Sequence, residues 1–436
     1  MTIDEQLLNG RSGAATGRRR TSAWAVVLLC MSFMLINFAD KAVIGFAGVQ
    51  IRQDLGLSAE QFGMVQSAFF WLFAAGAILV GLLTSKISPR WIVVALIVVW
   101  TLTLVPLAGA VGFGTLLVCR IILGFAEGPA AALVMSIAHS WFPPDKRALP
   151  SGVINAGTSL GPLLAAPTLT WVIAAFDWHA AFIVLIAAGL VWLAFWLPLG
   201  RMGTERATAV ASADALPERV PYGVLLTRPT IIGLGLLLFL AYWGTSLKVS
   251  WLPLFLREGL GYSATATGYL VTLPYAVGVL ANIGFGLLSN WLSARGVSNR
   301  LARGWLAAGL VVANGLSMLG FALLGQSGLQ MLFVVLGFSL YSAAFAISFA
   351  AVSDVVPAKQ RGVVFGFVIA FYSLGGVLAP MLMGLFVGAG ETPAAGYSTG
   401  FTFTGALMAI GCIAAVWLIR PEKDAAALVA RYATRG

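Results

Sequence analysis

Residues 23–49 read AWAVVLLCMSFMLINFADKAVIGFAGV, an apolar run long enough to cross a lipid bilayer as one helix. The run contains one adjacent pair of opposite charges, Asp40 and Lys41. A charge at the centre of a membrane-spanning helix costs at least about 2.5 kcal/mol, so it normally faces a wet cavity, an opposite charge or a charged ligand. The stretch therefore predicts a membrane helix and marks one part of it as a candidate functional site.

The rest of the chain has the composition of a protein embedded in lipid. Its 436 residues are 60% hydrophobic and 10% charged, with a mean hydropathy of +0.94. Backbone groups in lipid need internal hydrogen-bond partners, so the apolar runs should be helices. We expect an all-α polytopic membrane protein with 12 transmembrane helices, at roughly 23–49, 61–84, 91–111, 114–138, 149–174, 179–199, 229–256, 264–288, 304–325, 328–352, 362–388 and 397–419.

A polar segment divides these helices into two sets of six. Residues 200–228 are rich in charged side chains and poor in large apolar ones, which is typical of a linker. The predicted organisation is a cytoplasmic tail, a six-helix bundle, a cytoplasmic linker, a second six-helix bundle and a second tail, over residues 1–22, 23–199, 200–228, 229–419 and 420–436.

Loop residues repeat between the two halves, which indicates an internal duplication. The two bundles should therefore be pseudo-symmetric. The repeated set is Pro143, Arg147, Gly152, Ala156, Ser159, Leu160 and Gly161, which recurs at an offset of 214 as Pro357, Arg361, Gly366, Ala370, Ser373, Leu374 and Gly375.

Basic residues are distributed unequally between the two sides of the membrane. Of 26 Lys and Arg, 21 fall on the side of the termini, and only Arg52 and Arg257 fall on the other. By the positive-inside rule both termini are cytoplasmic, and we expect a multi-pass protein of a bacterial inner cell membrane. The net charge of +10 is spread over short loops, so nucleic-acid binding is not predicted.

The cysteines and histidines form no pattern that would bind a metal or support catalysis. Cys30, Cys119 and Cys412 lie in separate predicted helices, and His139 and His179 lie near opposite membrane surfaces. We therefore predict no metal, no cofactor and no enzymatic activity.

Three further charges lie within predicted helices: Arg120, Glu127 and Lys248. Seven residues make nearly two helical turns, so Arg120 and Glu127 lie on one face of the fourth span, about 10 Å apart. Three bases and two acids within the membrane suggest an anion site with carboxylates that can carry protons. The alternative is a set of ion pairs that only hold the bundle together, but apolar residues would stabilise a bundle equally well.

Lys248 belongs to the seventh span, in the other half of the chain. If it faces the cavity, it offers a second cation for an extended or doubly charged anion. The alternative is a lysine that extends to the nearer membrane surface. Polar and aromatic residues at comparable depth are further candidates for substrate binding: Trp71, Asn155, Tyr242, Tyr275, Asn282, Tyr372 and Ser373.

Six plus six spans, a central linker and repeated loops resemble the major facilitator superfamily, over nearly the whole chain. The loop after the second span resembles the superfamily's Gly-x-x-x-Asp-Arg-x-Gly-x-Arg motif at Gly81, Lys86 and Arg90, whereas Ser85 and Ser88 depart from it. The resemblance implies a monomeric transporter whose two halves rock about a site near the midplane of the bilayer.

Within that superfamily, the first and fourth spans resemble the anion:cation symporter family of organic-acid and sugar-acid transporters. Residues 37–41, Asn-Phe-Ala-Asp-Lys, resemble the family's Asn-Tyr-x-Asp-Arg, and residues 120–127 resemble its Arg-x-x-x-Gly-x-x-Glu. The resemblance implies that Asp40 and Glu127 couple protons and that Arg120 binds substrate. Lys41 departs from the family's arginine and replaces a planar fork with a point charge.

The predicted function is import of a small organic anion, such as a sugar acid, hydroxy acid or aromatic acid, by proton symport across the lipid bilayer. Lys41, Arg120 and Lys248 would bind the anion. Sodium coupling in place of proton coupling, and proton-driven export or antiport, are the alternatives that the sequence leaves open. A membrane sensor that binds an anion without moving it is disfavoured, because no soluble signalling domain is present.

Overall fold

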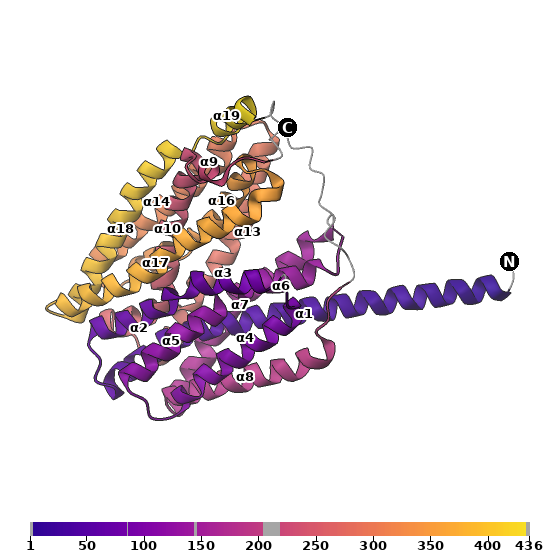
Figure 1. The fold of residues 1–436 in the computed structure, drawn as a ribbon. Helices are drawn as coiled ribbons and strands as arrows, with labels where there is room; N and C mark the ends of the chain where they lie inside the picture. Colours follow the sequence, from indigo (N-terminus) through magenta and orange to yellow (C-terminus); the bar gives the residue numbers. More distant parts are fainter. Residues whose placement is uncertain (1–2, 85, 144–145, 204–218, 433–436) are drawn as a thin grey trace.

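The computed structural model describes residues 3–84, 86–143, 146–203 and 219–432, and these residues are arranged as two groups of helices (Figure 1). All regular structure in these ranges is helical. Twelve helical segments are long and apolar enough to cross a membrane. The predicted all-α polytopic fold is therefore confirmed.

The N-terminal group contains the first six spans, and two of these spans are each built from two consecutive helices. The second span breaks at Leu72, and the fourth breaks at Gly128 and Pro129. The elements are α1 (Ile3–Asp54), α2 (Ala59–Trp71), α3 (Phe73–Leu83), α4 (Pro89–Leu104), η1 (Pro106–Ala108), α5 (Phe113–Glu127), α6 (Ala130–His139), α7 (Ala148–Ala175) and α8 (Trp178–Leu199).

The C-terminal group contains the other six spans and a final helix that follows them. The elements are α9 (Tyr222–Leu226), α10 (Pro229–Ser250), α11 (Leu252–Leu254), η3 (Phe255–Gly259), α12 (Ala264–Leu270), α13 (Thr272–Ala294), η4 (Arg300–Trp305), α14 (Leu306–Leu323), α15 (Gly328–Gly337), α16 (Ser342–Val355), η5 (Ala358–Gln360), α17 (Arg361–Ala389), α18 (Pro393–Leu418) and α19 (Pro421–Tyr432).

The polar segment between the groups lies partly outside the described residues, at positions 204–218. Its final part is attached to the C-terminal group. The Val220 backbone N–H donates to Gln360 Oε1 at 2.8 Å, and Gln360 Nε2 donates to the Val220 carbonyl at 2.7 Å. This paired contact holds the end of the segment against η5, at the start of α17.

The two groups repeat one local structure at the predicted offset. Arg147 Nε donates to the Phe142 carbonyl at 3.0 Å, and Arg361 Nε donates to the Val356 carbonyl at 3.1 Å. Both bonds reach back five residues across the turn that precedes a long helix. Arg147 and Arg361 therefore have the same structural role in each half.

The two groups contact each other closely at the end of the molecule opposite the termini, which we call the closed end. There α2 packs on α17 so tightly that a Cβ on Gly63 would lie 2.7 Å from the Pro380 carbonyl. At the other end, the open end, a Cβ on Gly81, Gly286 or Gly366 would meet nothing within 4 Å. The halves diverge toward this end, where both termini lie (Figure 1).

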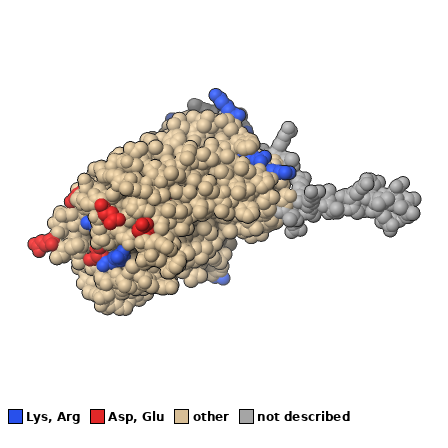
Figure 2. All heavy atoms as spheres, turned by 90° about the horizontal axis from the view of Figure 1, so that it is seen from below, with Lys and Arg blue, Asp and Glu red and all other residues tan. Residues whose placement is uncertain are grey.

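The surface has the charge distribution of a membrane protein. On the face shown in Figure 2, acidic side chains and a few basic ones gather at the left end, the charged side chains visible toward the other end are basic, and a broad uncharged band lies between them. Large apolar side chains such as Leu82, Trp171, Leu280 and Ile410 are more than half exposed. An apolar belt of this kind is what a chain surrounded by lipid requires.

Candidate functional site

The break between α5 and α6 places Glu127 at the end of a helix in the interior of the protein. Pro129 has no backbone N–H, so it cannot continue the hydrogen bonds of α5, and it is the residue directly before α6. Gly124, one turn before, lets α2 approach α5, because a Cβ there would clash with the Phe69 carbonyl. Two small sequence features therefore bring the charged face of α5 against α2.

Lys41 of α1 joins this face through an ion pair. Its Nζ lies 3.2 Å from Glu127 Oε2 and donates to Asn37 Oδ1 at 2.6 Å. The Glu127 side chain is completely buried, whereas the Lys41 side chain is 11% exposed. Lys41 therefore contacts the buried Glu127 carboxylate and is itself partly accessible.

Asp40 occupies the buried side of the same region. It is fully buried, and its Oδ2 accepts a hydrogen bond from Trp100 Nε1 at 2.9 Å. Its Oδ1 accepts none from the described residues, and neither does either oxygen of Glu127, although Glu127 Oε2 is in ion-pair contact with Lys41. Asp40 interacts electrostatically with Lys41, Arg120 and Glu127. Four charged groups thus form one cluster, in which several carboxylate oxygens lack hydrogen-bond donors.

Arg120 is the second cation of the cluster and is 4% exposed. Its guanidinium carbon lies 4.6 Å from the centre of the Phe69 ring, and its Nε has no hydrogen-bond partner among the described residues. Lys41 similarly lies 4.3 Å from the centre of the Phe38 ring. Aromatic faces stabilise a cation without neutralising its charge, so both bases keep their ability to bind an anion.

A cavity of about 60 Å³ lies beside this cluster, between the two halves. The N-terminal half contributes Lys41 and Arg120, and the C-terminal half contributes Tyr242, Thr245 and Ser246. Gln66 of α2 also lines it and donates to the Ser250 carbonyl of α10 at 3.2 Å. The cavity is therefore charged on one wall and carries hydroxyl groups on the other.

Of the other predicted binding residues, only Tyr242 lines this cavity. Tyr242 lines it, and its ring lies 4.8 Å from the ring of Tyr372. Ser373 is buried and donates to the Ala370 carbonyl of its own helix. Trp71, Asn155 and Asn282 do not line the cavity. Of these three, Trp71 and Asn155 are exposed and Asn282 is half-buried.

Lys248 is buried but does not line the cavity. It is 6% exposed, and its Nζ lies 4.4 Å from the Tyr275 ring centre and 5.1 Å from the Tyr341 ring centre. No carboxylate of the described residues forms an ion pair with it. It belongs to the same helix as Thr245 and Ser246, but its ammonium group packs against the two tyrosine rings and not against the cavity.

Several residues of the site were not predicted from the sequence, among them Thr245 and Ser246 of the C-terminal wall, and Trp100 and Gln66. Trp100 reaches Asp40 from α4, and Gln66 bridges the halves. Gln66 carried a usable signal, because an uncharged amide within an apolar span needs a buried partner. Trp100 carried none, because tryptophan in a membrane helix is most often a packing or interface residue.

A family model named Major Facilitator Superfamily matches residues 29–321 and 296–432. Among similar proteins is a hexuronate transporter of Bacillus subtilis, 28% identical over 91% of this chain and 94% of its own length. A probable galactarate/D-glucarate transporter of the same organism is 24% identical, over 94% of this chain and 96% of its own. A probable sulfoacetate transporter of Cupriavidus necator is 25% identical, over 92% of this chain and 94% of its own.

Solved structures with the same fold are also transporters. A bacterial homologue of the human lysosomal transporter Spinster, in an inward-facing and occupied conformation, superposes with a TM-score of 0.74 at 17% identity, over 93% of this chain and 96% of its own. A D-xylose–proton symporter gives a TM-score of 0.68 at 15% identity, over 88% of this chain and 97% of its own. At these identities the likeness concerns the fold alone.

Proposed function

Because this chain belongs to the Major Facilitator Superfamily and is a multi-pass membrane transporter, we propose that it imports a small organic anion together with protons. The single observation that carries the proposal is the ion pair between Lys41 and Glu127 at the edge of a cavity that Arg120 also lines. The relatives named as a hexuronate transporter, a probable galactarate/D-glucarate transporter and a probable sulfoacetate transporter support an acidic solute.

The anion binds between Lys41 and Arg120. Both cations line the cavity, so each can contact an anion there, even though Lys41 also pairs with Glu127. In a site largely excluded from water, a charge-assisted hydrogen bond is about twice as strong as a neutral one, so a carboxylate is held firmly there. The hydroxyl groups of Tyr242, Thr245 and Ser246 on the facing wall are suited to the hydroxyl groups of a sugar acid.

Proton coupling follows from competition for Lys41. When Glu127 is ionised, it occupies the Lys41 ammonium group. When Glu127 takes up a proton, that ammonium group is released and becomes free to bind the substrate carboxylate. Anion and proton therefore favour each other's binding, as symport requires.

Asp40 serves as the second proton acceptor. It lies next to Glu127 in the charged cluster, and its Oδ1 is without a hydrogen-bond donor among the described residues. Two neighbouring buried carboxylates repel each other when both are ionised, so a proton on either one is favoured. The pair can pass a proton between its members while the solute moves.

Alternating exposure follows from the closed and open ends. If the positive-inside rule holds, the termini and the open end face the cytoplasm, and the closed end faces outward. Arg52 of α1 and Glu258 of η3 join the halves at the closed end, with Nη1 and Oε2 2.7 Å apart. The conformation described here is then the one that releases solute inward.

Internal pH in proteoliposomes tests this function. Sugar acids, hydroxy acids, aromatic acids and dicarboxylates are added outside in turn, with empty liposomes as the control. Acidification of the interior by one class is expected and would identify the substrate class. Uptake that appears only with a sodium gradient, or only when the proton gradient is reversed, would instead establish sodium coupling or export.

A further inference from the structure

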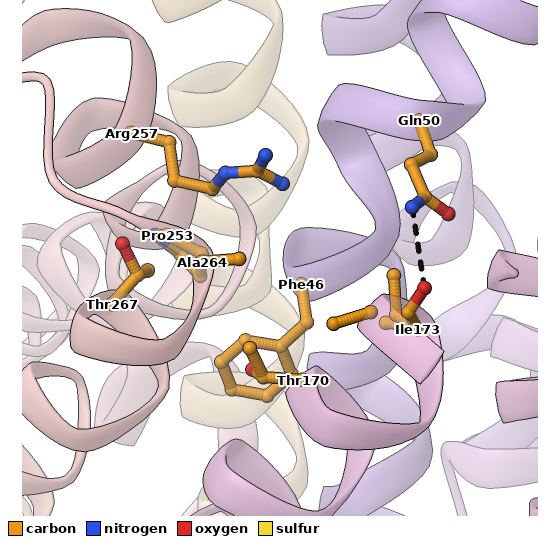
Figure 3. A pocket seen from close by; sticks show the side chains of 9 residues that line it. Phe46, Gln50, Thr170, Ile173, Pro253, Arg257, Ala264 and Thr267 are labelled. Carbon is orange, nitrogen blue, oxygen red and sulfur yellow. Dashed lines mark hydrogen bonds between the residues drawn. The ribbon is translucent and has the colours of Figure 1, made fainter. Parts of the chain in front are cut away.

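A second cavity, of about 40 Å³, lies between the halves at the closed end. Gln50 of α1 and Thr170 of α7 line it from the N-terminal half. Arg257 of η3 and Thr267 of α12 line it from the C-terminal half, and Figure 3 shows the Arg257 side chain extending across the space toward the helix of Gln50. Its wall therefore exists only where the halves are in contact.

Several buried polar atoms of this cavity have no hydrogen-bond partner among the described residues. They are Gln50 Oε1, Thr170 Oγ1 and Thr267 Oγ1. Thr267 is only 2% exposed, so bulk water does not reach it freely. Gln50 is held in place because its Nε2 donates to the Ile173 carbonyl at 3.3 Å (Figure 3). Buried polar groups left in this way mark a place that a ligand or ordered water fills.

The cavity also contains a positive charge without a counter-charge. No carboxylate of the described residues forms an ion pair with Arg257. The adjacent Glu258 is engaged elsewhere: its Oε2 pairs with Arg52 at 2.7 Å and accepts a hydrogen bond from the Tyr397 hydroxyl at 3.2 Å. Arg257 is half-buried, and an anion beside it would accept charge-assisted hydrogen bonds from a guanidinium group that no ion pair occupies.

We propose that this cavity binds a small monovalent anion, of the size of chloride or bromide, which holds the closed end together. The Arg257 guanidinium and the hydroxyl groups of Thr170 and Thr267 donate to it. The cavity has room for a few water molecules, which suits a small ion. A water molecule beside the anion satisfies Gln50 Oε1.

The consequence is a conformational preference that depends on the salt. An anion that binds only when both halves line the cavity stabilises that conformation by simple mass action. At an anion concentration ten times the dissociation constant, the ratio of molecules with the halves in contact at the closed end to molecules with them apart rises about tenfold. The site is separate from the transport cavity, so this inference does not rest on the identity of the solute.

Crystals of the full-length protein grown in sodium bromide give the direct test. Bromine anomalous density between Arg257 and Thr267 is expected in the wild type and absent in Arg257→Gln. Water in the wild-type cavity, with no bromide, would overturn the proposal. Bromide density in the crystal does not depend on transport activity. A negative result would therefore overturn the anion site without bearing on the proposed transport function.

Thermal unfolding of the purified protein gives the second test, in sodium bromide and in sodium sulfate of equal ionic strength. The midpoint in bromide minus the midpoint in sulfate is expected to be higher for the wild type and for Arg257→Lys than for Arg257→Gln or Thr267→Val, a comparison in which the general effects of the two salts cancel. Arg295→Gln, which removes an exposed base outside this cavity, is the matched control and should respond like the wild type. Bromide density together with the same difference between the two salts in the wild type and in Arg257→Gln would mean an adventitious ion only, and would overturn the proposal.

Discussion

The N-terminal wall of the 60 Å³ cavity, the proposed transport site, carries Lys41 and Arg120, with Asp40 and Glu127 in the same charged cluster, whereas the C-terminal wall carries Tyr242, Thr245 and Ser246. The buried cation near the second wall, Lys248, is covered by two tyrosine rings. The halves share a fold and one repeated loop structure, but not this charge pattern. The difference suggests that one half couples protons to the anion and that the other half recognises the rest of the solute.

Arg120→Ala should have the largest effect, because it removes a cavity-lining cation from the charged wall. Loss of a buried, hydrogen-bonded charge partner costs about 2–5 kcal/mol, which is at least about thirtyfold in affinity. Direct binding of the anion to purified protein measures this. Thr245→Val, on the other wall, is the control and should cost much less. Equal losses in the two variants would remove the distinction between the walls.

Glu127→Gln should separate coupling from binding. The amide cannot carry the proton, but it leaves Lys41 free for the substrate. Accumulation driven by a pH gradient should fall at least about tenfold, as expected for loss of an essential proton carrier. Exchange of labelled for unlabelled solute should continue. Normal accumulation by this variant would rule out the proposed role of Glu127.

Lys248→Met should affect the second wall selectively. If the lysine turns from the Tyr275 and Tyr341 rings toward the cavity when solute binds, it meets the far end of an extended anion. Uptake of glucarate, with two carboxylates, should fall about tenfold, as for loss of one charge-assisted contact worth about 1.4 kcal/mol. Uptake of gluconate, with one carboxylate, should change little. An equal effect on both solutes would assign Lys248 a packing role only.

Lys41→Arg should have the smallest effect and should strengthen binding. The guanidinium fork holds a carboxylate through two parallel bonds, whereas an ammonium group acts as a point charge. We expect affinity for the anion to rise by a few-fold, about 1 kcal/mol. Competition binding against the wild type measures the change. Weaker binding would show that the ion pair with Glu127 requires the compact lysine.

The charge pattern of the N-terminal half could be predicted from the sequence, because a charge within an apolar run is conspicuous. Seven residues of helical spacing were enough to place Arg120 and Glu127 on one face. The break after Glu127 was less visible. Pro129 indicated a bend, but only the structure shows that α5 ends at Glu127 and that α6 begins at Ala130.

The C-terminal wall could not be predicted to the same extent. Its residues are hydroxyl-bearing and aromatic, and in a membrane helix such residues serve packing as often as binding. Tyr242 was predicted and lines the cavity, whereas Asn155 and Asn282 do not line it. The Lys248 side chain packs against Tyr341, which lies almost 100 residues further along the chain. Nothing in the sequence around Lys248 predicts this contact.

Proton uptake on substrate binding tests the central claim most directly. Purified protein in a weakly buffered solution receives the anion while a pH indicator reports protons removed from solution, for the wild type and for Glu127→Gln. We predict that the wild type takes up protons as the anion binds, because the released Lys41 ammonium and the protonated Glu127 form together, and that Glu127→Gln takes up fewer. Equal proton uptake by the two proteins, at equal occupancy by the anion, would contradict the account.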